Sequence, residues 1–426
     1  MHNRTRLHGV IDLATAALGG GLATFAEVHK AIARKPFSAL RLAPGVGKVS
    51  ETVRVVHDGI TTLVYAGMGT AITAAGGAAR LAASIAGAED HEPRTGSLSD
   101  LAVTALNGFA GERLEREGNP LACRMSLRHA GRSVPLERAA LATAFPAASP
   151  RVAVFVHGLA CNETLWRLHA EQHYQDPHTT YGTRLQSDLG YTPLYVRYNT
   201  GLHISENGRR LAQLLERLVA EWPVPVAELV LVGHSMGGLV VRSATHYGAT
   251  LDWTRRTRHL FFLGTPHLGA PLEKAANVTA WLLSLLDVTR PFGAVLNRRS
   301  VGIKDLRFGS LRDEDWRDVD LDALLANRAG DVPLLPGAAH YFIAATVTRD
   351  AWHPLGVAVG DLLVREASAL GRGRLRRIQF PLEHGRHFGP LHHLQLLNHP
   401  DVYQQMRRWL EGGTANATAI APSTQG

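Results

Sequence analysis

The stretch "ELVLVGHSMGGLVVRS", residues 228–243, joins an apolar run, a serine between glycines and a second apolar run. A continuous apolar run is typical of a strand buried on both faces of a parallel sheet. Leu239, Val240 and Ala244 then follow helical spacing. The stretch therefore predicts strand, tight turn and helix, with Gly233 and Gly237 permitting a strained backbone that presents Ser235 as a nucleophile. The alternative is a serine that only occupies a tight turn.

Strands and helices are expected to alternate around this stretch. Strands are expected over residues 151–159, 192–200, 227–235, 259–266 and 340–347, with helices over 207–222 and 236–248. A two-strand hairpin is expected around the turn 129–131, and a solvated edge strand within the arginine-rich residues 371–380. This order predicts an α/β fold with a mostly parallel central sheet.

The length of 426 residues suits two unequal domains. We expect an Ala/Gly-rich helical N-terminal region over 1–115, a catalytic domain over 120–412 with an inserted cap at about 271–336, and a flexible tail over 413–426. Residues 60–79 carry no charge and could span a bilayer. Their Ala, Gly and Thr are weakly hydrophobic, so a buried hairpin or peripheral membrane contact through residues 1–90 is favoured over a span.

Charge and cysteine content exclude two classes of protein. The net charge is +8, but the basic residues are spread along the chain and do not form the extended patch that nucleic acid requires. The two cysteines are too few for a disulfide scaffold, which favours a reducing, cytoplasmic location. Association with a membrane remains the open alternative.

A serine nucleophile needs a base to take its proton and an acid to orient that base. On an α/β sheet with such an elbow the chain order is serine, acid, histidine. Asp361 and His393 fit this order, with Asp350 as the competing acid and His392 as the competing base.

Stabilising an oxyanion requires two backbone N–H groups. Met236, directly after the serine, is expected to supply one. Leu159 is expected to supply the other, because Gly158 lets the loop after the first central strand turn inward. Cys161 lacks an elbow and is interpreted as a small residue lining the pocket.

Several motifs together resemble one family. They are "HGL" (157–159), "GHSMGG" (233–238), "GTPHLGAP" (264–271), "GDLLV" (360–364) and "HHLQLLNHPDVY" (392–403). Over about residues 120–412 they resemble α/β-hydrolase lipases and esterases, above all bacterial triacylglycerol lipases and lipase domains like those of GPI-inositol deacylases. The resemblance implies the α/β-hydrolase fold, with Ser235 as nucleophile, Asp361 as acid and His393 as base.

Two positions depart from that family. Leu362 stands where members commonly carry glycine, so the acid loop is expected to differ in backbone shape. Gln395 stands where calcium-binding members carry aspartate, so the structural calcium is not implied. No metal and no organic cofactor is expected.

The sequence predicts a serine carboxylic-ester hydrolase acting on apolar or lipid-like esters. An apolar wall for the acyl chain is expected from four cap residues: Trp281, Leu282, Leu285 and Leu286. A helix that only covers the sheet is the alternative for this segment. An acyltransferase with the same triad and a non-catalytic scaffold docking to a membrane or partner are the alternative functions.

Overall fold

The computed structural model describes residues 95–269, 300–317, 332–348 and 377–417, together with 9, 11, 12, 15, 330, 361, 364 and 366–371. The chain divides into two compact units. The first comprises Met1–Glu92, Leu114–Ala122 and Asp287–Arg298, and within it Asn119 Nδ2 donates to the Gly9 carbonyl at 3.2 Å. The second comprises Pro93–Arg113, Cys123–Leu286 and Arg299–Gly426.

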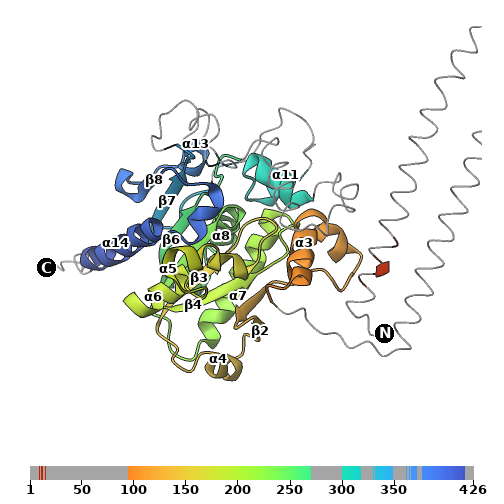
Figure 1. The fold of residues 1–426 in the computed structure, drawn as a ribbon, viewed down its shortest axis with the longest axis horizontal. Coiled ribbons are helices and arrows are strands. Elements are labelled where there is room, and N and C mark those ends of the chain that lie inside the picture. The colour runs from red at the N-terminus through yellow and green to blue at the C-terminus, as the bar shows by residue number, and fades with distance from the viewer. Residues whose placement is uncertain are drawn as a thin grey trace, which may run out of the picture. The chain divides into compact units, whose positions relative to one another are not determined.

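An eight-stranded sheet in the order β2-β1-β4-β3-β5-β6-β7-β8 forms the centre of the second unit (Figure 1). Strands β1 and β2 form an antiparallel hairpin, and β1 also pairs antiparallel with β4. All other neighbouring strands are parallel. The strands are β1 Ser126–His129, β2 Arg132–Val134, β3 Arg151–Val156, β4 Thr192–Arg197, β5 Glu228–His234, β6 Thr257–Leu263, β7 Ala339–Ala345 and β8 Gly385–Phe388. The expected mostly parallel sheet is confirmed.

Helices cover both faces of the sheet (Figure 1). Because alternate side chains of a strand point to opposite faces, Phe155 and Val232 pack toward α6 and α14, in one cluster with Tyr181 and Tyr403. On the other face α8 packs on β3, β5 and β6, and α7 packs on α8. The α-helices are α3 Leu98–Arg116, α4 Arg138–Ala144, α5 Ala170–Tyr174, α6 Tyr181–Leu189, α7 Ile204–Glu221, α8 Met236–Tyr247, α9 Asp252–Arg256, α11 Val301–Phe308, α13 Glu366–Ala369 and α14 Pro400–Ala417.

Short 3-10 helices complete the elements of the second unit. They are η1 Glu163–Arg167, η4 Asp313–Asp315, η5 Leu382–His384 and η6 His393–Leu397. The last of these, η6, begins at His393, and the backbone of that histidine is therefore part of a helical turn.

One predicted strand and two predicted domain boundaries differ from the structure. The edge strand expected within 371–380 is wrong over the described residues 377–380, where Arg377 forms an isolated bridge and the Phe380 ring stacks on Phe342 at 4.0 Å. Strand β8 forms that edge of the sheet instead. Helix α14 runs to Ala417, five residues beyond the predicted end of the domain, and residues 98–113 of α3 belong to the unit that contains the sheet.

Several expectations lie outside the described residues. They concern the hairpin or membrane contact within residues 1–90, the cap residues Trp281, Leu282, Leu285 and Leu286, and Asp350 and Leu362. Residues 300–317, within the predicted cap, dock on α7 and α8: Asp305 accepts the Ile204 N–H at 2.9 Å, and the Leu311 carbonyl accepts the Ser243 hydroxyl at 2.7 Å.

Among the helices within the described ranges, none combines the length and apolar character needed to cross a membrane.

Candidate active site

Ser235 lies at the carboxyl end of β5 in a strained backbone conformation. Its φ is 53° and its ψ −127°, a region that residues other than glycine occupy at a cost of about 1–3 kcal/mol. Its N–H donates to the Leu263 carbonyl at 2.8 Å, and its own carbonyl accepts from Gly238 at 3.0 Å. These bonds to β6 and to the first turn of α8 hold the strained residue between strand and helix.

The glycines around Ser235 are required by close packing. A Cβ on Gly233 would lie 2.5 Å from the Gly238 Cα, and one on Gly237 would lie 2.2 Å from the Val156 carbonyl oxygen. Neither neighbour is the far end of a flexible side chain, so a larger residue would push α8 away from β3 and β5. The tight elbow expected from the sequence therefore results from backbone contact between strand and helix.

His393 and Asp361 form a buried pair. His393 Nδ1 lies 2.7 Å from Asp361 Oδ2, and the two side chains are 4% and 1% exposed. The His393 N–H also donates to the Asp361 carbonyl at 3.0 Å, and the Val364 N–H donates to Asp361 Oδ1 at 2.7 Å. A carboxylate only accepts, so Nδ1 carries the proton and Nε2 is left as the basic nitrogen.

The imidazole of His393 lies beside the elbow. A Cβ on Gly264 would come within 3.0 Å of His393 Cε1, and Gly264 directly follows Leu263, whose carbonyl binds the Ser235 N–H. The ring of His234, the residue before the serine, lies 4.7 Å from the His393 ring between centroids. The residues predicted as nucleophile, base and acid thus come from the end of β5, η6 and a loop, with the His393 ring beside the segment that binds the Ser235 N–H.

The neighbouring histidines have other environments. His234 Nε2 lies 3.1 Å from the His393 carbonyl oxygen, and burial, followed by the proximity of His393, holds the pKa of His234 well below its usual value. The main-chain N–H of His392 donates to Gln395 Oε1 at 2.9 Å. His393 is therefore the histidine of this group that the structure pairs with Asp361.

The loop after β3 passes directly over the serine. A Cβ on Gly158 would lie 3.0 Å from the Ser235 Cβ. The backbone N–H groups of Leu159 and Met236 have no hydrogen-bond partner among the described residues. One of these amides directly follows the serine and the other lies in the loop that passes over it, and such unpaired N–H groups are the donors that an oxyanion would need.

Cys161 and the histidine of the "GTPHLGAP" motif, His267, are both buried. Burial raises the pKa of the Cys161 thiol to about 12, and its Sγ lies 3.2 Å from the Leu159 carbonyl oxygen, so it is a protonated packing residue. His267 is fully buried between the rings of Phe262 and Phe342, each about 5.0 Å away. Neither offers a reactive group to a substrate.

Over the part of the chain that the structure describes, no group of three or more His, Cys, Asp or Glu side chains is arranged to hold a metal ion. The side-chain oxygen of Gln395 accepts the main-chain N–H of His392.

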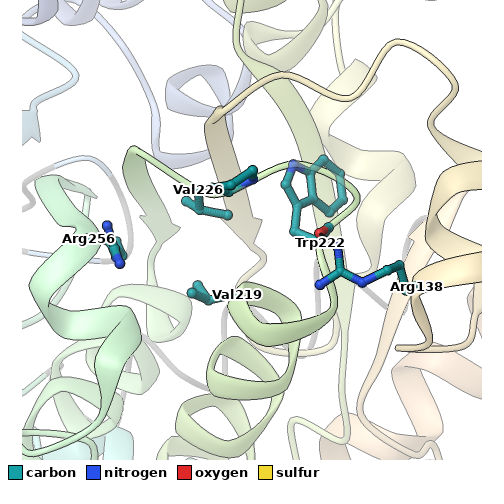
Figure 2. A pocket seen from close by; sticks show the side chains of 6 residues that line it. Arg138, Val219, Trp222, Val226 and Arg256 are labelled. Atoms are coloured by element: carbon teal, nitrogen blue, oxygen red, sulfur yellow. Dashed lines mark hydrogen bonds between the residues drawn. The ribbon is translucent and has the colours of Figure 1, made fainter.

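A cavity of about 240 Å³ lies at the opposite ends of the strands (Figure 2). Trp222 and Val226 line it before β5 begins, with Val219, Arg138 and Arg256 around it. The Arg138 guanidinium already donates to the carbonyls of Ala220 and Trp222 at 2.9 and 3.0 Å, where it terminates α7. Ser235 follows the other end of β5, so this cavity is separate from the site.

The architecture and the strained serine define the class: the chain has the α/β-hydrolase fold with a nucleophile elbow. Residues 148–319 match the family described as "Putative serine esterase (DUF676)", and this segment contains both the elbow and the loop after β3. With these features the chain is a serine ester hydrolase of the α/β-hydrolase type. No curated protein matches it.

Solved structures that the chain is similar to include lipases and esterases. The mature lipase BlEst2 of Bacillus licheniformis is 18% identical, covers 62% of this chain and 91% of its own, and has a TM-score of 0.40. Esterase B of Lactobacillus rhamnosis is 12% identical, covering 64% and 79%, with a TM-score of 0.34. Phospholipase PlaB of Legionella pneumophila is 15% identical, covering 62% and 63%, with a TM-score of 0.34. These identities and TM-scores are too low to support any conclusion about the substrate.

The sequence did not reveal several residues that shape this site. Gly238 approaches Thr265 so closely that a Cβ would lie 1.9 Å from its Oγ1, and Gly264 makes room for the His393 ring. Both glycines belong to motifs that the sequence singled out, "GHSMGG" and "GTPHLGAP". Their partners lie far away in the chain, so the motifs alone could not assign these contacts.

Proposed function

We propose that the chain hydrolyses apolar carboxylic esters through an acyl-enzyme on Ser235. The observation that carries this is the buried Asp361–His393 pair, 2.7 Å between Oδ2 and Nδ1, beside a serine with φ of 53°. Aspartate holds the imidazole in the tautomer whose Nε2 can take the serine proton, which is the role of this pair in serine hydrolases.

In the first half-reaction the Ser235 oxygen attacks the ester carbonyl while His393 Nε2 takes its proton. The amides of Leu159 and Met236 stabilise the tetrahedral oxyanion by donating hydrogen bonds to it. Both N–H groups are available for this because neither is hydrogen-bonded within the described residues. His393 then returns the proton to the leaving alcohol. Water repeats the sequence on the acyl-enzyme and releases the acid and the free serine.

The preference for apolar acyl groups is supported by the sequence of the inserted segment. Trp281, Leu282, Leu285 and Leu286 recur at helical spacing within it and could line an acyl channel. A panel of p-nitrophenyl esters of increasing acyl length tests this preference. We expect kcat/KM to rise with chain length, and a fall would contradict an apolar acyl site.

The catalytic proposal is tested with a fluorophosphonate probe and mass mapping of the labelled peptide. We expect wild type to be labelled at Ser235 and to lose p-nitrophenyl ester turnover in parallel, while Ser235→Ala is unlabelled. Ser243→Ala is the matched control, because that serine lies on α8 with its hydroxyl bound to the Leu311 carbonyl. Equal labelling of wild type and Ser235→Ala would refute the assignment.

The acid is tested by comparing Asp361→Asn with Asp350→Asn. Only Asp361→Asn should reduce turnover strongly, since asparagine would favour the wrong imidazole tautomer. Equal, mild losses would contradict the role proposed for Asp361. Gas or liquid chromatography of the products with an added alcohol distinguishes hydrolysis from acyl transfer.

A further inference from the structure

Ala160, the residue after the proposed oxyanion donor Leu159, has an unfavourable backbone conformation. Its φ is 52°, in the left-handed region that alanine rarely adopts, and it is buried. Its N–H donates to Thr200 Oγ1 at 3.0 Å. The direction of the Leu159 amide depends on this turn, so whatever holds Ala160 in place also aims that amide.

Helix α3 contacts the turn at three points on one of its faces. Asp100, Thr104 and Gly108 are spaced four residues apart, which places them in one row along a helix. A Cβ on Gly108 would lie 2.6 Å from the Ala160 Cβ and 2.9 Å from its Cα, so the helix backbone presses directly on the strained residue. Only glycine at this position allows that approach.

The other two residues of the row hold Asn162. This side chain is buried, and its Nδ2 donates to Asp100 Oδ2 at 3.0 Å and to Thr104 Oγ1 at 3.1 Å. Its Oδ1 accepts the Thr164 N–H at 3.0 Å and so caps η1. The loop is therefore fixed to α3 at both Ala160 and Asn162, on either side of Cys161.

The row is itself anchored to the sheet by buried charges. Arg197 of β4 donates to both Asp100 oxygens at 2.7 and 3.2 Å and to Glu163 at 2.7 Å. Burial alone would raise the pKa of Glu163, but its hydrogen bonds and ion pairs with Arg197 and Arg128 outweigh this and lower it. The Ser300 hydroxyl donates to the Gly108 carbonyl at 2.7 Å, which holds α3 at the other end of the row.

We propose that α3 is a positioning element of the active site, in which Gly108, Thr104 and Asp100 fix the Ala160 turn and thereby aim the Leu159 amide at the oxyanion. This inference rests on the proposed function and adds a requirement to it: residues 98–113, which precede the family match at 148–319, are needed for transition-state stabilisation. These residues touch no substrate and act through the loop.

The test is Gly108→Ala in the full chain, with Gly412→Ala as the matched control, because a Cβ on Gly412 meets nothing within 4 Å. Active sites are counted by end-point fluorophosphonate labelling, and kcat is expressed per labelled site. We expect Gly108→Ala to lower kcat per site by about 10- to 100-fold with KM within threefold, since sub-ångström to 1 Å misplacement of a catalytic group has effects of this size. The affinity for a boronic acid, which forms a tetrahedral adduct, should fall by the same factor.

A purely structural role would instead lower the melting temperature and the number of labelled sites while kcat per site stayed within twofold of wild type, and that result would overturn the inference. Thr104→Val is the milder second variant if Gly108→Ala does not fold. It removes one of the two bonds that Asn162 donates, and we expect a 3- to 10-fold lower kcat per site; no change would equally overturn the inference. Wild type without labelling or turnover would refute the proposed function itself, and the inference with it.

Discussion

Three buried histidines should make the fold sensitive to mild acid. His157, His259 and His340 are 0%, 7% and 5% exposed. Burial is the largest cause in each case, and it lowers the pKa of each to about 4. His340 illustrates the reason: its Nε2 accepts the Leu335 N–H at 3.1 Å, and a protonated ring could not accept that bond. Acidification from pH 7 to pH 5 is the perturbation.

The sign follows from proton linkage. Between the folded pKa of about 4 and the unfolded value of about 6.5, the unfolded chain binds more protons, so the free energy of unfolding falls as the pH falls. Integrated from pH 7 to pH 5, each histidine contributes a loss of about 1.8 kcal/mol, and the three together about 5.5 kcal/mol. A loss of this size is a large part of the roughly 5–15 kcal/mol that stabilises a typical domain.

Urea unfolding followed by tryptophan fluorescence at pH 5, 6, 7 and 8 measures this loss. His259→Gln should reduce the loss between pH 7 and pH 5 by about 2 kcal/mol, because glutamine keeps polar atoms but does not titrate. His246→Gln, an exposed position on α8, is the matched control and should leave the slope unchanged. A free energy of unfolding that differs by less than about 1 kcal/mol between pH 5 and pH 7, or an unchanged slope in His259→Gln, would refute the reasoning.

Further predictions follow from the site and its supports. Asp361→Asn should lower kcat by about 10³- to 10⁴-fold with little change in KM, and a purely KM effect in steady-state kinetics would contradict its role. Gly238→Ala, whose Cβ would lie 1.9 Å from Thr265 Oγ1, should destabilise the fold by about 1–3 kcal/mol in urea, with partial rescue by Thr265→Ala; no rescue would place the strain elsewhere. Arg197→Met should cost about 3–5 kcal/mol because it leaves the buried Asp100 carboxylate without its cation and Glu163 with Arg128 alone, whereas Arg255→Ala, which removes an exposed pair, should cost well under 1 kcal/mol; equal losses would contradict this reasoning.

The elbow could be predicted because its signals are local. A buried strand, a glycine-flanked serine and a helix lie within residues 228–247, and each is encoded by spacing and residue type over a few turns. The strained φ of Ser235 follows from that local packing. The order of Asp361 and His393 was expected from the resemblance, and the structure brings their side chains to 2.7 Å across 32 residues of sequence.

Other features could not be predicted because they depend on contacts between distant segments. The arginine-rich stretch 371–380 alternates like a strand, but Phe380 packs on Phe342 and β8 pairs with β7 instead. The sequence predicts residues 98–113 of α3 as part of an N-terminal helical region, yet Asp100 pairs with Arg197 of the central sheet, 97 residues away. Asp100, Thr104 and Gly108 recur every four residues along α3, but this spacing does not indicate a function until the loop that these residues contact is known.

The sequence by itself determined the class of chemistry and the class of fold. Alternating strands and helices predict a mostly parallel sheet, and a serine at its elbow predicts nucleophilic catalysis, because backbone preferences and hydrophobic periodicity act over short windows. Only the tertiary structure decided which histidine pairs with Asp361 and which main-chain amides remain unpaired beside Ser235. It also decided that α3 supports the loop over the serine. Those outcomes depend on how segments far apart in the chain bury one another's charges and leave room for one another's backbones, and no short stretch of sequence contains that information.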